Sequence, residues 1–469
     1  MLKTYLWSAI ERLSVLLGNL FVFWFLALIS GPEQFAPIAM LSAIMIVANA
    51  IAEAGMYTAL IRLSDITRND YAVAFVFNMV TSFVLTLSLV AFSTELASFL
   101  NQSILNECIQ LIAPLCVIYA FGICYKVDLV KSMRIKSLAQ SSLIAFVASI
   151  ISLILCHFIL ATDPIDMAVI YYWFFISVSS VVYTIQSPLK LKMSAFANIF
   201  WKRSDDFYRF ASTTFVVSLL NSLFTNAYTL LIGNLYTPRD LSYINQASRF
   251  SQIIPSNVSM IMSRANYPKL VSLRPMPQDF RYFLRLNVTL LTAIMVLVCG
   301  LSSILSAPIV NLLLGERWLE MIPILSILFL VMALIPINAL WMQVVQTLGN
   351  SMLYVSIEVI KKINFAVMLY VIAGLPAIYF CYGLAITSSL ALLIHLLAAV
   401  FFLKIPVTTL VLEPLKFIVY GLMVYFVLRV INIDVIISAL LFLGTYLFIM
   451  IVSLPKDIKS TVINKLRAF

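Results

Sequence analysis

The chain has 469 residues and a formal net charge of +10; 63% of its residues are hydrophobic and only 11% are charged. A water-soluble protein cannot bury so much apolar surface, so this composition excludes a soluble enzyme. The positive charge does not indicate a nucleic-acid partner, because the basic residues form short clusters between apolar stretches and no basic face. The chain is therefore expected to be an all-α polytopic membrane protein.

Apolar stretches of about 20 residues recur along the chain, and each is long enough to cross ~30 Å of hydrocarbon as a helix. Proline and glycine mark several connections between them, as at Gly31-Pro32 and Thr237-Pro238. We expect about fourteen transmembrane helices, near 7–29, 36–60, 72–93, 104–125, 138–160, 165–187, 210–232, 241–263, 284–306, 320–344, 352–373, 377–403, 415–431 and 435–453.

An internal repeat organises these helices. The segment from Ile29 to Leu41 aligns at a constant offset with the segment from Leu235 to Ala247, so that Pro32 matches Pro238. Each half holds an even number of spans, which predicts two halves of the same orientation related by an axis along the membrane normal. We expect a six-helix bundle over 1–200, a second over 201–410, and two further helices with a basic tail over 411–469.

Lysine and arginine gather in alternate connections, which are expected to face the cytoplasm. The opposite connections carry acids instead, such as Glu33, Asp163 and Glu320. Both termini are therefore expected inside, and the first helix is interpreted as an uncleaved signal anchor. The cytoplasmic clusters include Arg62, Arg68, Lys126, Lys131, Arg134, Lys136, Lys190, Lys192, Arg264, Lys269, Arg274, Lys404 and Lys416.

No pattern of catalytic or metal-binding residues is apparent. The six cysteines lie in or beside apolar spans without C-x-x-C or Cys/His spacing, so we expect free thiols and no metal. No P-loop, nucleotide-sugar acid pair or Ser/His/Asp set is visible, so we expect no catalytic residues, no cofactor and no enzyme.

Charged residues inside apolar spans are candidates for function, because each costs roughly 2.5–3.5 kcal/mol at the centre of a membrane helix. The expected spans contain Glu11, Arg12, Glu53, Arg249, Glu358, Lys361 and Lys362.

Several motifs, in this order and spacing, carry a resemblance to a known family. They are WSAIERL at Trp7, ISGPEQFAPIAML at Ile29, AEAGMYTALIRLSDIT at Ala52, VFNM at Val76, the run from Arg209 to Arg249, and LLLGERWLEMIPIL at Leu312. With them the chain resembles the polysaccharide-type transporters of the multidrug/oligosaccharidyl-lipid/polysaccharide exporter superfamily, in particular the Wzx-type flippases of the colanic-acid and lipopolysaccharide class.

The resemblance implies two six-helix bundles around a central cavity that opens alternately to either side of the bacterial inner membrane. It also implies a polyprenyl-diphosphate-linked oligosaccharide as substrate, with membrane lipids around it. Because helices one, two and eight line the cavity in this family, Arg12 and Arg249 are the leading candidates for binding the diphosphate. Relatives usually carry Arg where Leu28 and Gln246 stand here, so the charge layout of the cavity is expected to differ.

Each candidate also has a structural interpretation. Arg12 lies near the start of its helix and can reach the headgroups instead. Glu53 either pairs with a basic residue or carries a coupling ion, H⁺ or Na⁺. Lys361 and Lys362 have the spacing of ion pairs with Glu358, and the alternative is contact with substrate.

Three functions agree with the sequence. The favoured one is a lipid-linked oligosaccharide flippase, for which a polysaccharide polymerase is the expected partner. The alternatives are an organic-cation exporter of the same superfamily and a membrane enzyme of glycan assembly. A cation exporter needs an acidic cavity, whereas the membrane charges here are mixed to basic. An enzyme usually carries a sizeable extra-membrane domain, whereas the connections here are short.

Overall fold

The computed structural model describes residues 2–62, 66–190, 235–349, 351–401, 408–431, 433–455 and 457–460, with single positions between 212 and 229. Over these residues the regular structure is helical and contains no strand. The chain divides into two compact units, Met1–Ser242 and Tyr243–Phe469, here called unit 1 and unit 2. The expected all-α fold is confirmed.

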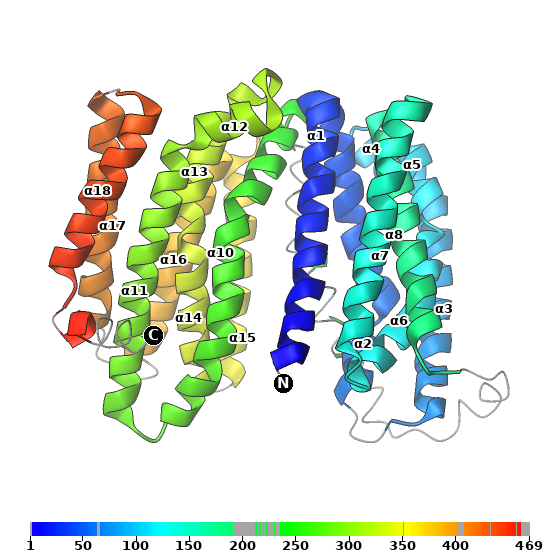
Figure 1. The fold of residues 1–469 in the computed structure, drawn as a ribbon, viewed down its shortest axis with the longest axis horizontal. Coiled ribbons are helices and arrows are strands. Elements are labelled where there is room, and N and C mark those ends of the chain that lie inside the picture. Colours follow the sequence, from blue (N-terminus) through cyan, green and yellow to red (C-terminus); the bar gives the residue numbers. More distant parts are fainter. Residues whose placement is uncertain are drawn as a thin grey trace. The chain divides into compact units, whose positions relative to one another are not determined.

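Unit 1 begins with a helical hairpin. Helix α1 (Leu2–Glu53) contains a non-helical residue, Gly31, with φ 72° and ψ 172°, and Pro32 follows it. A positive φ is accessible to glycine, and proline fits the start of a helix, so GPEQF is the turn between two arms. Figure 1 shows the chain reversing direction here. The first arm matches the expected helix 7–29, whereas the second ends at Glu53, before the expected end of the helix 36–60.

A second break follows directly. Ala54 and Gly55 both have positive φ, 49° and 70°, and the short helix α2 (Met56–Arg62) starts after them. Figure 1 places α2 at the same end of unit 1 as the N-terminus. The remaining helices of unit 1 are α3 (Arg68–Ala91), α4 (Ser93–Phe99), α5 (Leu105–Ile112), α6 (Leu115–Lys131), α7 (Ile135–Leu155), the π-helix η1 (Cys156–Leu160) and α8 (Pro164–Gln186).

The expected helix over 210–232 lies largely outside the described residues, although the described positions in it, such as Ser212 and Leu219, are helical. The next helix, α10, begins at Pro238 and crosses into unit 2. The helices from there on are α10 (Pro238–Leu273), α11 (Pro277–Ile304), α12 (Ser306–Leu314), the 3₁₀ helix η4 (Glu316–Met321), α13 (Ile322–Met332), α14 (Leu334–Leu348), α15 (Ser351–Ile372), α16 (Ile378–Phe401), α17 (Thr408–Ile431) and α18 (Val435–Ser453).

The order of elements recurs along the chain, as the repeat predicts. The long helix α3 is followed by the short α4 and then by α5 and α6, and the long helix α11 is followed by the short α12 and then by η4, α13 and α14. Pro32 follows the turn between the arms of α1, and its counterpart Pro238 begins α10. The GERW motif forms the turn into η4: Gly315 has φ 78°, and Trp318 is buried with its ring centroid 5.9 Å from that of Tyr243.

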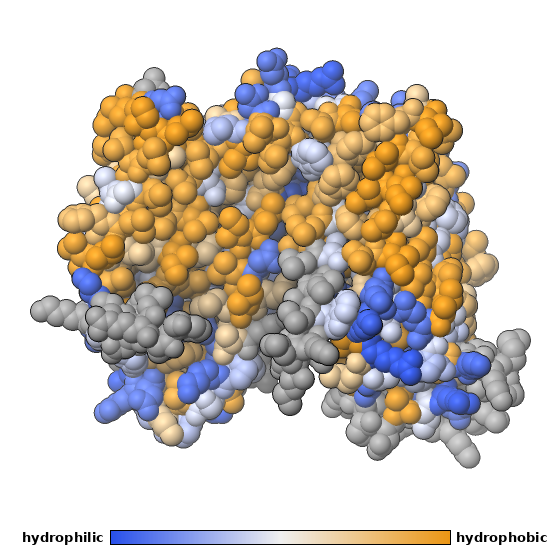
Figure 2. Space-filling model, viewed as in Figure 1, coloured by the Kyte–Doolittle hydropathy of each residue, from blue (hydrophilic) through white to orange (hydrophobic). Residues whose placement is uncertain are grey.

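The surface is that of a membrane protein. Ten helical segments of the described chain are long and apolar enough to span a bilayer, and the first, Ser14–Glu53, contains both arms of the hairpin. In Figure 2 apolar side chains cover much of the visible face of each unit, and hydrophilic side chains gather toward the helix ends. The six cysteines are buried and free, as expected. The chain is a multi-pass membrane protein of about fourteen helices.

Candidate functional site

A group of polar side chains in the described part of unit 1 surrounds Lys126 on α6. Its ammonium lies 5.6 Å from the ring centroid of Tyr57 and interacts electrostatically with Tyr119, Tyr183 and Glu53. All five side chains are half-buried. These residues, here called the Lys126 group, come from α1, α2, α6 and α8, so four helices converge on one cation.

Local sequence features explain this convergence. The break at Ala54 and Gly55 separates Glu53 at the end of α1 from Tyr57 in α2. On α6 the spacing of Tyr119 and Lys126 is two helical turns, which puts both on one face. Helices α6 and α8 approach closely because the position opposite Ser180 is a glycine.

The close approach rests on Gly122, where a Cβ atom would lie 2.7 Å from Ser180 Oγ. That hydroxyl donates a hydrogen bond of 2.9 Å to the carbonyl oxygen of Ile118. The contact lies one turn before Lys126 on α6 and one turn before Tyr183 on α8, and it therefore fixes the spacing of these two side chains.

Lys126 has no direct acidic partner. Over the described residues no carboxylate oxygen lies within 4.0 Å of its ammonium nitrogen, and no side-chain hydrogen bond to it is formed. Lys126 is half-buried on α6, so its ammonium is only partly solvated. A poorly solvated ammonium with open donors favours a bound anion.

The structure places the first predicted residue close to this group without describing its side chain. Arg12 lies in α1, and its side chain is outside the described part of the structure. Its neighbour Glu11 interacts electrostatically with Tyr57. The early turns of α1 therefore lie within electrostatic range of the Lys126 group, and the role of Arg12 stays a prediction.

The predicted arginine of unit 2 lies on a polar stretch of α10. Arg249 is half-buried, and its Nε donates a hydrogen bond of 2.9 Å to Oδ1 of Asn245, one turn earlier. The preceding residues Gln246 and Ser248 are buried. A run of polar residues in the interior is atypical of a helix that faces lipid on all sides, which supports the interpretation of α10 as a lining helix.

The two predicted lysines of unit 2 lie on α15. Lys361 forms an ion pair of 2.8 Å with Glu358, with side-chain exposures of 27% and 30%. Lys361 also interacts electrostatically with His395 on α16, which is buried. His395 Nδ1 lies 3.2 Å from Oδ1 of Asn338 on α14, and Asn338 donates to the carbonyl oxygen of Ser388.

Polar contacts therefore join α14 to α16, and Lys361 on α15 acts on His395 only electrostatically. Lys362 is half-buried on the same helix as Lys361. The pairing of Lys361 with Glu358 agrees with the structural interpretation of the spacing. Substrate contact by Lys361 and Lys362 stays a prediction.

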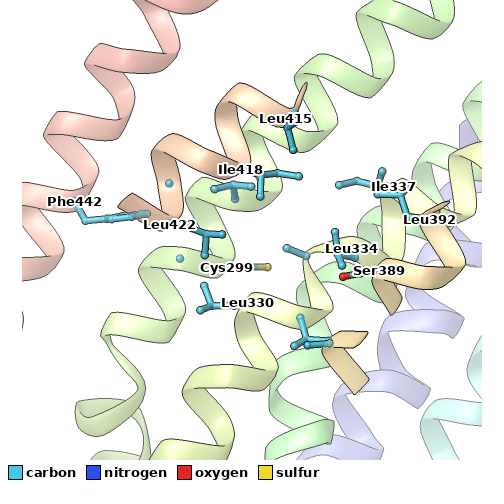
Figure 3. Close-up of a pocket in the computed structure, with 16 residues that line it drawn as sticks. Cys299, Leu330, Leu334, Ile337, Ser389, Leu392, Leu415, Ile418, Leu422 and Phe442 are labelled. Carbon is cyan, nitrogen blue, oxygen red and sulfur yellow. The ribbon is translucent and has the colours of Figure 1, made fainter. Parts of the chain in front are cut away.

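An apolar cavity of about 370 Å³ lies within unit 2, between α11, α13, α14, α16, α17 and α18. Figure 3 shows Leu334, Leu392 and Leu422 among its lining side chains, and Ser389 is one of its few polar lining residues. Such a cavity suits a hydrocarbon chain better than a polar ligand. No group of three metal-binding side chains occurs in the described residues.

Sequence reasoning missed two parts of this arrangement. It assigned Lys126, together with Lys131 and Arg134, to a basic connection expected to face the cytoplasm, but α6 continues to Lys131. The only available signal was the apolar residues between these charges, such as Val127 and Leu129. The contact of His395 with Asn338 joins positions far apart in the chain, and no local pattern predicts it.

The fold and these groups define a multi-pass α-helical membrane protein with charged side chains inside its spans. A family model described as "Polysaccharide biosynthesis protein" matches residues 25–323, and the chain belongs to this family. It is 22% identical over 423 residues, 87% of this chain and 82% of the relative, to an "Uncharacterized membrane protein in cps region" of Klebsiella pneumoniae.

Solved structures share the fold. A "Lipid II flippase MurJ, inward closed conformation" matches with a TM-score of 0.70 and 16% identity over 95% of this chain and 97% of that one. An inward-facing multidrug resistance transporter of the MATE family and MOP superfamily matches with a TM-score of 0.67 and 11% identity, over 92% and 100%. The chain therefore belongs to a polysaccharide biosynthesis family and shares the fold of these transporters.

Proposed function

We propose that this protein is a flippase that moves a polyprenyl-diphosphate-linked oligosaccharide from the cytoplasmic to the outer leaflet of the cytoplasmic membrane by alternating access. The cargo is the repeat unit of an O-antigen, a capsule or an exopolysaccharide. The observation that carries the proposal is the match to a polysaccharide biosynthesis family in a chain that has a transporter fold.

The chemistry of this cargo explains the polar and apolar groups of the two units. Its diphosphate and sugars cannot cross hydrocarbon unaided, since burying charged and polar groups costs many kcal/mol. Lys126 of unit 1 and Arg249 of unit 2 are each a candidate to offset the diphosphate charge, and Arg12 is a further candidate ligand. The apolar cavity of unit 2 fits a segment of the lipid tail, which stays in an apolar medium throughout.

Glu53 is the candidate for coupling to H⁺ or Na⁺, because it is a half-buried carboxylate at a break between two helices. Lys361 and Lys362 are secondary candidates for substrate contact. A polysaccharide polymerase is the proposed partner, since such an enzyme would consume the translocated repeat unit.

The direct test is transport in reconstituted vesicles. Purified full-length protein should expose a polyprenyl-diphosphate-linked oligosaccharide on the opposite leaflet, and cells that lack the protein should accumulate lipid-linked repeat units and lose surface polysaccharide. The Arg12→Ala, Arg249→Ala double variant should behave like the deletion at normal protein level. Normal surface polysaccharide in the deletion strain would contradict the proposal.

A second candidate, export of organic cations, rests on the fold shared with a multidrug transporter. The charges inside the described spans disfavour it, because Lys126 and Arg249 repel a cation. Ethidium efflux by the reconstituted protein, with no exposure of the oligosaccharide lipid, would favour this candidate.

The proposed orientation places both termini in the cytoplasm. In a variant without native cysteines, single cysteines at Gln34, Asp163 and Glu320 should react with an impermeant thiol reagent added to intact cells. Cysteines at Lys131 and Arg274 should react only after the membrane is permeabilised. Labelling of the second set in intact cells would overturn the orientation.

A further inference from the structure

We propose that the Lys126 group is a phosphate-binding site in unit 1, which takes the diphosphate of the lipid carrier while its headgroup is still at the cytoplasmic leaflet. This inference rests on the proposed function. It assigns contact with the lipid headgroup to Lys126, which the sequence analysis placed in a connection between helices.

The first step of the argument is the state of the ammonium. Lys126 carries its charge in a half-buried position, and over the described residues its nitrogen has neither an ion pair nor a side-chain hydrogen bond. An ammonium has three donors, and each donor left without an acceptor in such a place costs free energy. A phosphate oxygen is an acceptor that also neutralises the charge.

The second step is the chemistry of the surrounding side chains. Tyr57, Tyr119 and Tyr183 each bring a hydroxyl that can donate to a phosphate oxygen, and all three retain some exposed surface. Glu53 lies beyond ion-pair distance of Lys126, so it offsets part of the buried charge without occupying the donors. The group therefore combines one cation, three hydroxyl donors and one more distant counter-charge.

The third step is depth. Lys126 lies five residues before the end of the apolar segment Leu105–Lys131, about 7.5 Å along the helix at 1.5 Å per residue. This is close to the membrane interface, where the phosphates of lipids lie. Lys131 and Arg134 follow in the connection expected to face the cytoplasm. A headgroup arriving from that leaflet therefore reaches Lys126 without first crossing the hydrocarbon.

The test measures binding of a polyprenyl diphosphate to the purified full-length protein. Lys126→Gln should weaken binding by about tenfold or more, the loss expected for one charge-assisted contact. Lys126→Arg should restore most of it. Lys190→Gln is the matched control, because Lys190 is exposed just after the end of α8 and the substitution removes the same charge.

Thermal unfolding in detergent establishes that each variant is folded. If Lys126→Gln does not fold, binding is measured with Tyr183→Phe instead. That variant removes only a hydroxyl and should still weaken binding severalfold. Wild-type affinity in a folded Lys126→Gln, or in Tyr183→Phe where that variant decides, overturns the site.

Two further measurements complete the test. The first identifies which lipid supplies the phosphate, and the second distinguishes failure of the site from failure of the proposed function. Displacement of the probe by phosphatidylglycerol at equal concentration assigns the site to ordinary anionic lipids, and resistance to displacement assigns it to the carrier. If the wild type transports the oligosaccharide lipid and Lys126→Gln binds and transports equally well, the site fails and the flippase stands. If the wild type binds at Lys126 but transports nothing, the flippase fails and the site stands.

Discussion

The basic side chains of the two units differ in their partners. In unit 1 Lys126 faces three tyrosines and a carboxylate beyond ion-pair distance. In unit 2 Lys361 is paired with Glu358 at 2.8 Å, and Arg285 on α11 binds both oxygens of Glu413 on α17, at 2.7 and 2.5 Å.

The difference separates structural charges from candidate ligands. A cation whose donors are already used by a carboxylate stabilises the protein and offers little to a substrate, whereas a cation without such a partner gains most from binding an anion. The presence of charge inside a span is therefore not enough to mark a substrate contact. The predictions below test this distinction within unit 2.

The largest effect is expected from Arg285→Ala. Arg285 joins α11 to α17 through Glu413 and also lies 3.0 Å from Asp457 beyond α18. Losing these charge-assisted contacts and leaving Glu413 without its cation should lower the free energy of unfolding by about 2–3 kcal/mol. Thermal unfolding in detergent measures it. The control is Arg281→Ala on the same helix, where the side chain is exposed. Equal losses of unfolding free energy in both variants would show that the contacts of Arg285 with Glu413 and Asp457 contribute nothing specific to stability.

A smaller effect is expected from His395→Leu. His395 is buried, and its contact with Asn338 is one of the polar links between α16 and α14. Removing the ring leaves Asn338 Oδ1 in the interior without this contact, at a cost of about 1–2 kcal/mol.

A double-mutant cycle checks that the cost belongs to this contact. The pair His395→Leu, Asn338→Leu should be less destabilised than the sum of the two single variants, because no orphaned polar group remains at this contact. Strict additivity would show that the two side chains do not interact.

Much of the fold was predictable from the sequence, because apolar length and proline or glycine punctuation are local signals. The turn at Gly31-Pro32 and the helix over 435–453, observed as Val435–Ser453, illustrate this. The short helices α4 and α12 were not predicted, because they lie in the connections after the expected spans 72–93 and 284–306 and are too short to span a membrane.

The site was less predictable for a physical reason. Sequence shows which charges fall in apolar stretches, as with Glu53 and Arg249, but it does not show which partners they meet. Lys126 became a candidate only when α1, α2 and α8 were seen to converge on α6. Conversely, the spacing of Glu358 and Lys361 did predict their ion pair, because an i,i+3 contact is local to one helix.

The smallest effect is expected from Glu358→Gln, which turns the partnered lysine of unit 2 into a cation like Lys126. The ion pair lies within one helix, and both side chains are partly exposed, so its loss should cost no more than ~0.5 kcal/mol. The freed ammonium should then bind inorganic pyrophosphate more tightly than in the wild type, measured by pyrophosphate-dependent thermal protection in a Lys126→Gln background. Adding Lys361→Gln to that variant should abolish the gain, because it removes the cation itself. A stability loss above ~1 kcal/mol, or a gain in pyrophosphate binding that survives Lys361→Gln, would show that the partner of a membrane cation does not decide its availability to an anion.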